Sequence, residues 1–229
     1  VAIDSDAASG TFASPNAGTH AITASGFGLT GAAGNYALTA QPTVPNATIN
    51  TKGLTVTGVT ANNKPYDGNT TATLDFTSAA LEGVLGGDDV TLNTSAASGA
   101  FASSNVGAWT VTVSGLTLDG VAKNNYALTQ PTTTASILGA TASVTGITAN
   151  NKTYDGNETA TLDFSGATLV GIVSGDDVTL DTSSAFAEFA DENVGAGKAV
   201  TIFDLALSGA DAGKYFLTQP GASANITPK

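Results

Sequence analysis

The chain has no cysteine, methionine or arginine, and it has only one histidine and one tryptophan. Without cysteine it can form neither disulfide bonds nor thiolate metal sites, and it has no thiol for catalysis. The single histidine, His20, is too little for a histidine-based zinc site or a reliable catalytic triad. We therefore predict that the chain is not an enzyme. The missing methionine indicates that Val1 follows a cleavage, or that the sequence is an internal piece.

Charged residues are also scarce, at 11% of the 229 residues. There are seven lysines, compared with 19 aspartates and glutamates. The resulting net charge of −12 repels nucleic acid and anionic lipid, and the dispersed lysines form no basic patch. No window approaches the roughly 18 consecutive apolar residues that a membrane-spanning helix needs. We expect neither nucleic acid nor a membrane span.

Glycine and threonine are abundant, and hydrophobic residues alternate with threonine along many short segments. Leu54 and Val56 alternate with Thr55 and Thr57, and the same pattern recurs around Val111. A period of two predicts half-buried strands with one threonine-rich face. Asp-Gly and Gly-Gly-Asp turn signals separate these segments, so the sequence predicts an all-β fold.

Internal repeats decide the domain organisation. Residues 61–69, 71–76 and 87–92 return 88 residues later as 149–157, 159–164 and 175–180. The first fifty residues match only the second half of this repeat, because residues 9–18 align with 98–107 and 35–39 with 125–129. The chain therefore divides into the C-terminal part of a first module (1–50), a complete second module (51–139) and a complete third module (140–229).

Seven or eight short strands in a module of about 88 residues predict an immunoglobulin-like β-sandwich without the usual cysteine pair. The connections between modules are short, which favours tandem modules arranged as a rod. Residues 1–50 lack counterparts of 54–59 and 71–76, so the first module should expose strand edges and an apolar face. Either the chain continues upstream, or strands from another molecule complete this module.

The segments Tyr66-Asp67-Gly68 and Tyr154-Asp155-Gly156 carry a family resemblance. With the surrounding motifs, both complete modules resemble the YDG repeat, which is related to the MBG repeats of large secreted adhesins of the filamentous-haemagglutinin type. The resemblance implies a stalk in a secreted or cell-surface adhesin or biofilm-matrix filament, and it supplies no catalytic residues. Its implied partners are neighbouring modules or copies of the same protein, with polysaccharide or a cell surface bound through a tip elsewhere.

An array of carbohydrate-binding modules remains the alternative function, and it would require a concave aromatic site in every module. Trp109 could stack on a sugar, and Tyr66 and Tyr154 could form exposed aromatic platforms. We interpret the two tyrosines instead as packed over the sandwich edge, with hydroxyls bonded to backbone, beside turns that need glycine at positive φ. His20 aligns with Trp109 and Gly197, and such variation indicates a surface position.

Two pairs of adjacent aspartates, each after a glycine, are weak calcium candidates: Asp88, Asp89, Asp176 and Asp177. Asp181, Asp191 and Glu192 could add oxygen ligands. Successive strand residues point to opposite faces, so a neighbouring pair is poorly placed to chelate one ion. We therefore interpret these residues as solvated turns, and we expect no cofactor and no calcium requirement for folding.

Two lysines lie close in sequence to asparagines, Lys64 to Asn69 and Lys152 to Asn157. Lysine–asparagine isopeptide crosslinks are therefore possible, but we interpret both lysines as exposed loop residues. The threonine rows are interrupted in every module, which argues against an ice-binding face.

Overall fold

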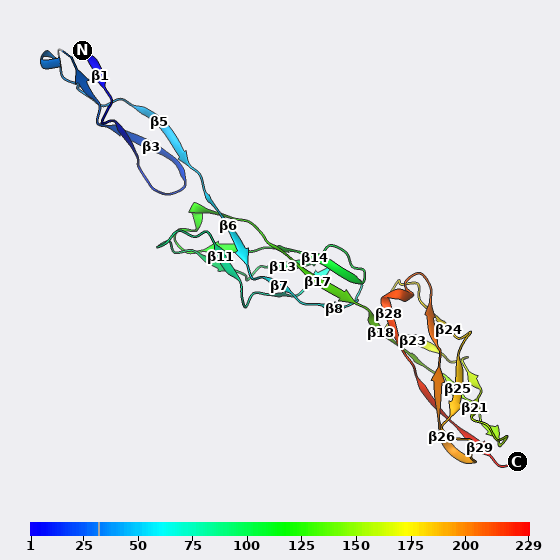
Figure 1. Cartoon of the computed structure of the whole chain (residues 1–229). Coiled ribbons are helices and arrows are strands. Elements are labelled where there is room, and N and C mark those ends of the chain that lie inside the picture. Colours follow the sequence, from blue (N-terminus) through cyan, green and yellow to red (C-terminus); the bar gives the residue numbers. More distant parts are fainter. Residues whose placement is uncertain (32) are drawn as a thin grey trace. The chain divides into compact units, whose positions relative to one another are not determined.

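The computed structural model describes residues 1–31 and 33–229, and it is built from short strands (Figure 1). No α-helix is present among these residues, and none of their helices has the length and hydropathy needed to span a membrane. The part of the first module that is described contains β1 (Ala2–Asp4), β2 (Ser9–Phe12), β3 (Gly18–Ser25), β4 (Gly28–Thr30), the 3-10 helix η1 (Ala33–Asn35) and β5 (Val44–Ile49).

The second and third modules contain the same elements in the same order. The second module contains β6 (Lys52–Thr57), β7 (Thr60–Ala61), β8 (Lys64–Pro65), β9 (Thr71–Ala72), β10 (Leu74–Asp75), β11 (Ala80–Glu82), β12 (Thr91–Asn93), β13 (Ser98–Phe101), β14 (Gly107–Ser114), β15 (Thr117–Asp119), η2 (Lys123–Asn125), β16 (Tyr126–Leu128) and β17 (Thr132–Leu138). The third module contains β18 (Ala140–Thr145), β19 (Thr148–Ala149), β20 (Lys152–Thr153), β21 (Thr159–Ala160), β22 (Leu162–Asp163), β23 (Thr168–Val170), β24 (Thr179–Asp181), β25 (Phe186–Phe189), β26 (Gly195–Phe203), β27 (Ala206–Ser208), η3 (Ala212–Lys214), β28 (Tyr215–Thr218) and β29 (Gly221–Thr227).

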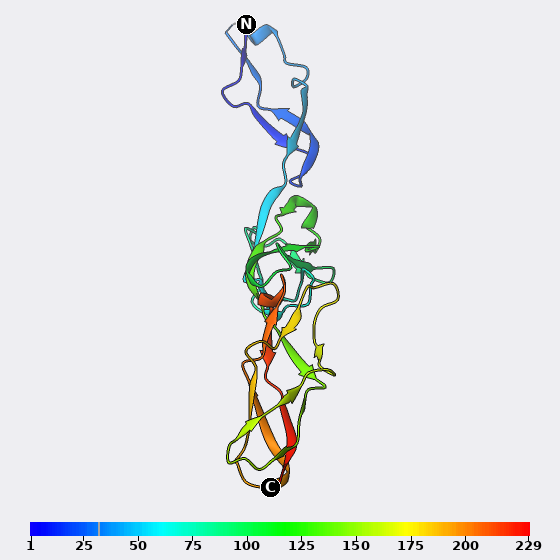
Figure 2. The same cartoon turned by 90° about the vertical axis from the view of Figure 1, so that its right-hand side faces the viewer.

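Each complete module has one five-stranded and one three-stranded sheet, with two short strand pairs. In the third module the orders are β20-β29-β26-β25-β21 and β23-β18-β28, and the second module repeats them as β8-β17-β14-β13-β9 and β11-β6-β16. The long antiparallel pair β26–β29 is orange and red in Figure 2. The prediction of an all-β chain of tandem sandwich-like modules is confirmed, and the arrangement of the modules as a rod stays a prediction.

The chain separates into two compact units whose boundary lies within the second module. The first unit contains Val1–Val59, Asp75–Ser98 and Val113–Thr132, and the second contains Thr60–Leu74, Gly99–Thr112 and Thr133–Lys229. The connection from β5 to β6 lies in the first unit, and the connection from β17 to β18 lies in the second. Each unit therefore contains one complete joint between two sequence modules.

Burial follows the predicted period of two. Leu54 and Val56 are buried on β6, while Thr55 and Thr57 are exposed, and Val200 and Ile202 are buried on β26. The apolar face expected on the first module is also present. Phe12 is 38% exposed, whereas Phe101 at the equivalent position of the second module is 3% exposed. The strands that cover Phe101 thus have no counterpart over Phe12 among residues 1–31 and 33–50.

Two equivalent turns place glycine where no side chain fits. Gly58 and Gly146 have φ values of +73° and +81°, and a Cβ at either position would lie 2.0 Å from a backbone oxygen, of Ser78 and Gly166 respectively. Both the positive φ and the close approach therefore require glycine.

We expect Gly146→Ala to lower the free energy of unfolding by about 1–3 kcal/mol, because alanine is strained at positive φ and collides with the Gly166 carbonyl. Urea titration followed by circular dichroism measures the change. Gly213→Ala is the matched control, since a Cβ at Gly213 meets nothing within 4 Å. Equal stability of the two variants would contradict this account.

Candidate functional site at the module joint

The Tyr-Asp-Gly segment of the second module extends an edge of its five-stranded sheet. Strand β8 runs parallel to the end of β17, with Lys64 opposite Ile137 and Pro65 opposite Leu138. The backbone N–H of Tyr66 continues this ladder by donating to the carbonyl of Leu138 at 2.7 Å. Tyr66 therefore leaves the sheet where the chain passes into the third module.

Lys64 fixes the turn that follows Tyr66. Its Nζ donates to Oδ1 of Asp67 at 2.7 Å, and to the carbonyl and Oδ1 of Asn69, each at 2.9 Å. Burial acts to raise the pKa of Asp67, but the hydrogen bonds from Lys64 and from the backbone of Asn69 outweigh it and hold the pKa below its usual value. The lysine thus neutralises the turn and orders it.

The interpretation of Lys64 and Lys152 as freely exposed lysines is wrong. Each side chain is only 17% exposed, and each ammonium lies over a phenylalanine ring, that of Phe101 or Phe189. Lys152 also reaches Oδ1 of Asn157 at 3.0 Å, so both lysines use the nearby asparagine as a hydrogen-bond acceptor. The lysine–asparagine crosslinks, which the sequence left open only as the alternative, stay a hypothesis.

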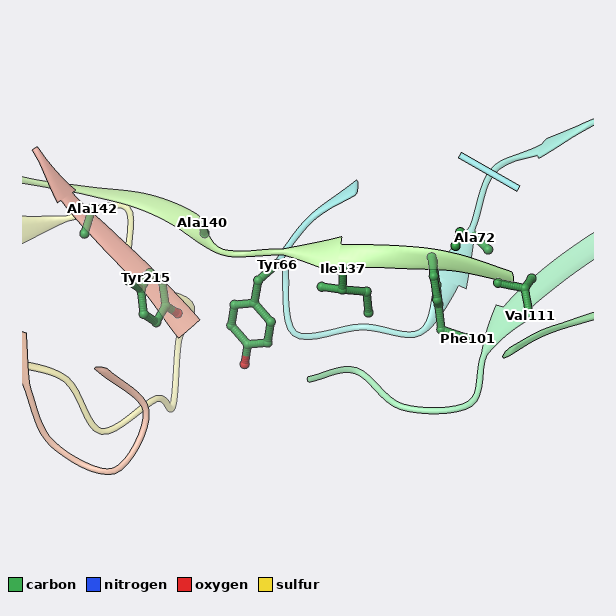
Figure 3. Close-up of a cluster of buried hydrophobic side chains, with 9 residues drawn as sticks. Tyr66, Ala72, Phe101, Val111, Ile137, Ala140, Ala142 and Tyr215 are labelled. Carbon is green, nitrogen blue, oxygen red and sulfur yellow. The ribbon is translucent and has the colours of Figure 1, made fainter. Parts of the chain in front are cut away.

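Tyr66 is buried at the joint between the second and third modules, at 5% exposure. Figure 3 shows its ring between Ile137 of its own module and Tyr215 of the next. The rings of Tyr66 and Tyr215 meet edge to face, with centroids 5.7 Å apart and planes at 84°. The Tyr66 hydroxyl donates to Oδ1 of Asp176 at 3.1 Å. The sequence predicted burial at a sandwich edge, but its prediction of a backbone partner is wrong.

Four residues of the third module, which we call the tyrosine pocket, receive this ring: Val173, Asp176, Lys214 and Tyr215. Tyr215 donates its hydroxyl to Oδ2 of Asp176 at 2.5 Å and accepts the backbone N–H of Val173 at 2.9 Å. Each carboxylate oxygen of Asp176 therefore accepts one tyrosine hydroxyl. A partly buried carboxylate needs such partners, since leaving it unsatisfied is costly.

Lys214 supplies the positive charge of the pocket. Its Nζ donates to the Tyr66 hydroxyl at 3.1 Å, lies 4.9 Å from the centroid of that ring, and is 3.8 Å from Oδ1 of Asp176. Hydrogen bonds to Asp211 and to Tyr66 raise the pKa of Lys214 well above its usual value. The ammonium therefore stays charged and holds Tyr66 by both its ring and its hydroxyl.

The same Tyr-Asp-Gly motif has different surroundings in the third module. Tyr154 donates its backbone N–H to Thr227, as Tyr66 does to Leu138, but Tyr154 is 39% exposed. Gly68 and Gly156 both have positive φ, as the sequence predicted, but a Cβ would meet Val173 at 2.9 Å only at Gly68. The turn is therefore a property of the motif, and burial of the tyrosine is a property of the joint.

The four aspartates proposed as calcium candidates separate into two roles. Asp88 and Asp176 accept tyrosine hydroxyls, whereas the neighbouring Asp89 and Asp177 accept backbone N–H groups of the loops at 121 and 210. Within residues 1–31 and 33–229, no three His, Cys, Asp or Glu side chains gather as a metal site would require. The expectation that folding needs no calcium stays a prediction.

His20, Trp109 and Lys198 occupy one structural position. Each ring nitrogen or ammonium bonds at 2.7 Å to the backbone oxygen of a loop asparagine, Asn16, Asn105 or Asn193. The alignment of His20 and Trp109 with Gly197 is therefore wrong by one residue, because the β-bulge between Gly195 and Lys198 inserts Gly197. Trp109 is half-buried against the core cluster around Phe101.

The sequence interpretation missed the role of the tyrosine pocket. The signals were present, since Tyr126 and Tyr215 recur in the matching segments 126–131 and 215–220, and Asp88 recurs as Asp176. Lys214 was not detectable from the repeat, because the second module has Asn125 in its place. A recurrent tyrosine with a recurrent aspartate on another loop would have indicated the pocket.

Comparison with known proteins identifies the repeated unit. The model of the YDG domain matches residues 50–135 and again residues 139–224, which confirms the resemblance seen in the motifs. A solved structure of fibronectin(III)-like modules of Clostridium thermocellum CbhA is 12% identical, with a TM-score of 0.17, and covers 76% of this chain and 94% of that chain. A search of curated proteins finds no match.

We expect Tyr66→Phe to lower the free energy of unfolding by about 1–2 kcal/mol, because Asp176 and Lys214 lose the hydroxyl between them. Tyr154→Phe removes the same atom from an exposed ring and should change stability by less than about 0.5 kcal/mol. Urea titration of both variants measures the difference. Equal losses would show that the hydroxyl does not stabilise the joint.

A second prediction concerns alkaline pH. Burial and the hydrogen bond to Asp176 raise the pKa of Tyr215 to about 12, above the value of about 10 for an unfolded chain. The neutral phenol therefore contributes stability that is complete below pH 10 and is lost as the pH rises towards 12. The free energy of unfolding, measured across this pH range, should fall more steeply for the wild type than for Tyr215→Phe, which has no phenol to ionise at this position. Parallel curves would contradict the shift.

Proposed function

Because the chain belongs to the YDG domain family, we propose that it is a mechanical segment, a stalk or shaft, of an extracellular bacterial adhesin or biofilm-matrix filament. The observation that supports this proposal best is the joint, where Tyr66 of one module is held by Asp176 and Lys214 of the next. Side-chain contacts across a joint resist bending and separation of neighbouring modules, as a stiff stalk requires.

The covalent connection at this joint is very short. Only Gly139 separates β17 from β18, and a Cβ there would lie 2.5 Å from the ring of Phe216. Tension on the chain therefore passes directly from the edge of one sheet into a strand of the next. Strand β18 pairs in parallel with β28 over four residues, so this tension acts along the ladder and loads several hydrogen bonds together.

We propose that the segment is not catalytic, is secreted or displayed on the cell surface, and has neighbouring modules or copies of the same protein as partners. The net charge of −12 supports the exclusion of nucleic acid, since a polyanion would be repelled. Any polysaccharide or cell-surface ligand would bind through a tip elsewhere.

The alternative, an array of carbohydrate-binding modules, has less support. Trp109 uses its indole N–H on the backbone of Asn105, and its ring is partly covered by the core. A surface hollow in the third module is lined by Phe164 and Phe186. In the second module the position equivalent to Phe186 is Ser98, which has no aromatic ring. Neither Trp109 nor this hollow therefore forms an aromatic binding site that both complete modules share.

Single-molecule force spectroscopy of the full 229-residue chain tests the mechanical role. We expect two discrete unfolding events, one for each complete module, each lengthening the chain by roughly 250 Å, given about 3.3–3.6 Å per extended residue less the distance that the folded module already spans. Tyr66→Phe should lower the force of one event, and Tyr154→Phe should lower neither. Smooth extension without discrete events would overturn the mechanical proposal, and binding of one glycan by both modules would favour the alternative.

A further inference from the structure

The tyrosine pocket is present a second time, at the joint between the first and second modules. Tyr126 donates its hydroxyl to Oδ2 of Asp88 at 2.5 Å and accepts the backbone N–H of Leu85 at 3.0 Å. These residues align with Tyr215, Asp176 and Val173, and they make the same contacts with nearly the same distances. The second module is therefore built to receive a tyrosine in the same way as the third.

This second pocket holds no tyrosine from the described residues. Leu85 is 56% exposed, and Asp88 is exposed, whereas the side chain of Asp176 is 12% exposed beneath Tyr66. Within residues 1–31 and 33–229, no hydrogen bond reaches Oδ1 of Asp88, the oxygen equivalent to the one that accepts Tyr66. A cavity of about 270 Å³ remains, lined in part by Lys52, Leu85, Asp88, Asn125 and Tyr126.

The rim of the cavity is formed by the loop before β3 and by Asn125. Asn125 accepts the backbone N–H of Ala17 at 2.8 Å and donates to Oδ1 of Asn16 at 3.0 Å. These contacts take the place of those made by Lys214 in the other joint. They hold Asn125 beside the cavity, which Leu85 and Asp88 also line.

The strand edge next to the cavity is also open. In the complete module, β17 pairs with β14 on one side and with β8, which precedes Tyr66, on the other. In the described part of the first module, β5 pairs only with β3, in the sheet β2-β3-β5. The edge at Ile49, equivalent to Ile137, thus lacks the parallel strand that would lead into the cavity. The exposed ring of Phe12 marks the adjoining face that a complete module covers.

We propose that this pocket and edge bind a third Tyr-Asp-Gly segment, the counterpart of residues 61–76 that residues 1–50 lack, by parallel strand addition to β5, with the tyrosine hydroxyl donated to Asp88. The recognised chemistry is an extended segment of the type Asn-Lys-Xaa-Tyr-Asp-Gly-Asn. Backbone hydrogen bonds would supply affinity, and the pocket would supply specificity for tyrosine. The seated Tyr66, with its matching set of contacts, shows how such a segment fits.

The donor is neither of the two Tyr-Asp-Gly segments in this chain, because both are already bound. Tyr66 donates its N–H to Leu138, and Tyr154 donates its N–H to Thr227, so each segment is part of its own sheet. Lys64 and Lys152 each add hydrogen bonds that would be lost on release. Donation by a second copy would therefore have to open a complete module.

A fluorescent peptide with the sequence of residues 61–76 is the probe, titrated into the full chain and followed by anisotropy. It contains the Tyr-Asp-Gly segment and the following stretch that residues 1–50 lack. We expect saturable binding that weakens roughly tenfold when the peptide tyrosine is replaced by phenylalanine, since a hydrogen bond to a carboxylate is lost. Absence of binding, or equal binding of the two peptides, would overturn the proposal.

Protein variants locate the site. Asp88→Ala should lower the affinity for the tyrosine peptide until it equals the affinity for the phenylalanine peptide. The control is Asp75→Ala, which removes the same charge from an exposed turn and should leave both affinities unchanged. Self-association of the chain without peptide, abolished by Tyr154→Ala, would overturn the choice of donor in favour of a second copy. The proposal does not depend on the mechanical role, because force spectroscopy reports on the occupied joint and the peptide reports on the open pocket.

Discussion

A single carboxylate, that of Asp176, accepts one tyrosine hydroxyl from each side of a module joint. Taking this charge out of water is tolerable only because Tyr66 and Tyr215 satisfy its oxygens and Lys214 balances its charge. The surrounding features serve this arrangement. The turn at Gly68 brings the backbone close to Val173, and Lys64 orders the loop so that the tyrosine ring is presented in one orientation.

The fold of each module could be predicted from the sequence because its determinants are local. Alternation such as that of Leu54 and Val56 with threonine sets the buried face of a strand, and turn glycines such as Gly146 end one strand and begin the next. Because the sequence repeats after 88 residues, strands assigned correctly in one module are also assigned correctly in the other. The family resemblance rested on the same repeated segments, and the domain match covers the same two modules.

The joint could not be predicted in the same way, because its partners are far apart in sequence. The hydroxyl of Tyr66 meets a carboxylate 110 residues later, in a different repeat, so alignment of one repeat with another does not bring them together. Lys214 has no lysine counterpart, and a single inserted residue at Gly197 shifted the alignment of Lys198. Such contacts depend on packing between modules, which no periodicity encodes.

The tyrosine and its pocket occupy different surfaces of a module, and this has a consequence for assembly. A contact between unlike surfaces is heterologous, so it does not close into a pair as a two-fold contact would. A module whose pocket is occupied by one neighbour still has its own tyrosine available for another contact. The third module illustrates this, because its pocket holds Tyr66 while its own Tyr154 is exposed. The joint therefore sets no upper limit on the number of modules, and duplication of one repeat supplies both halves of every new contact.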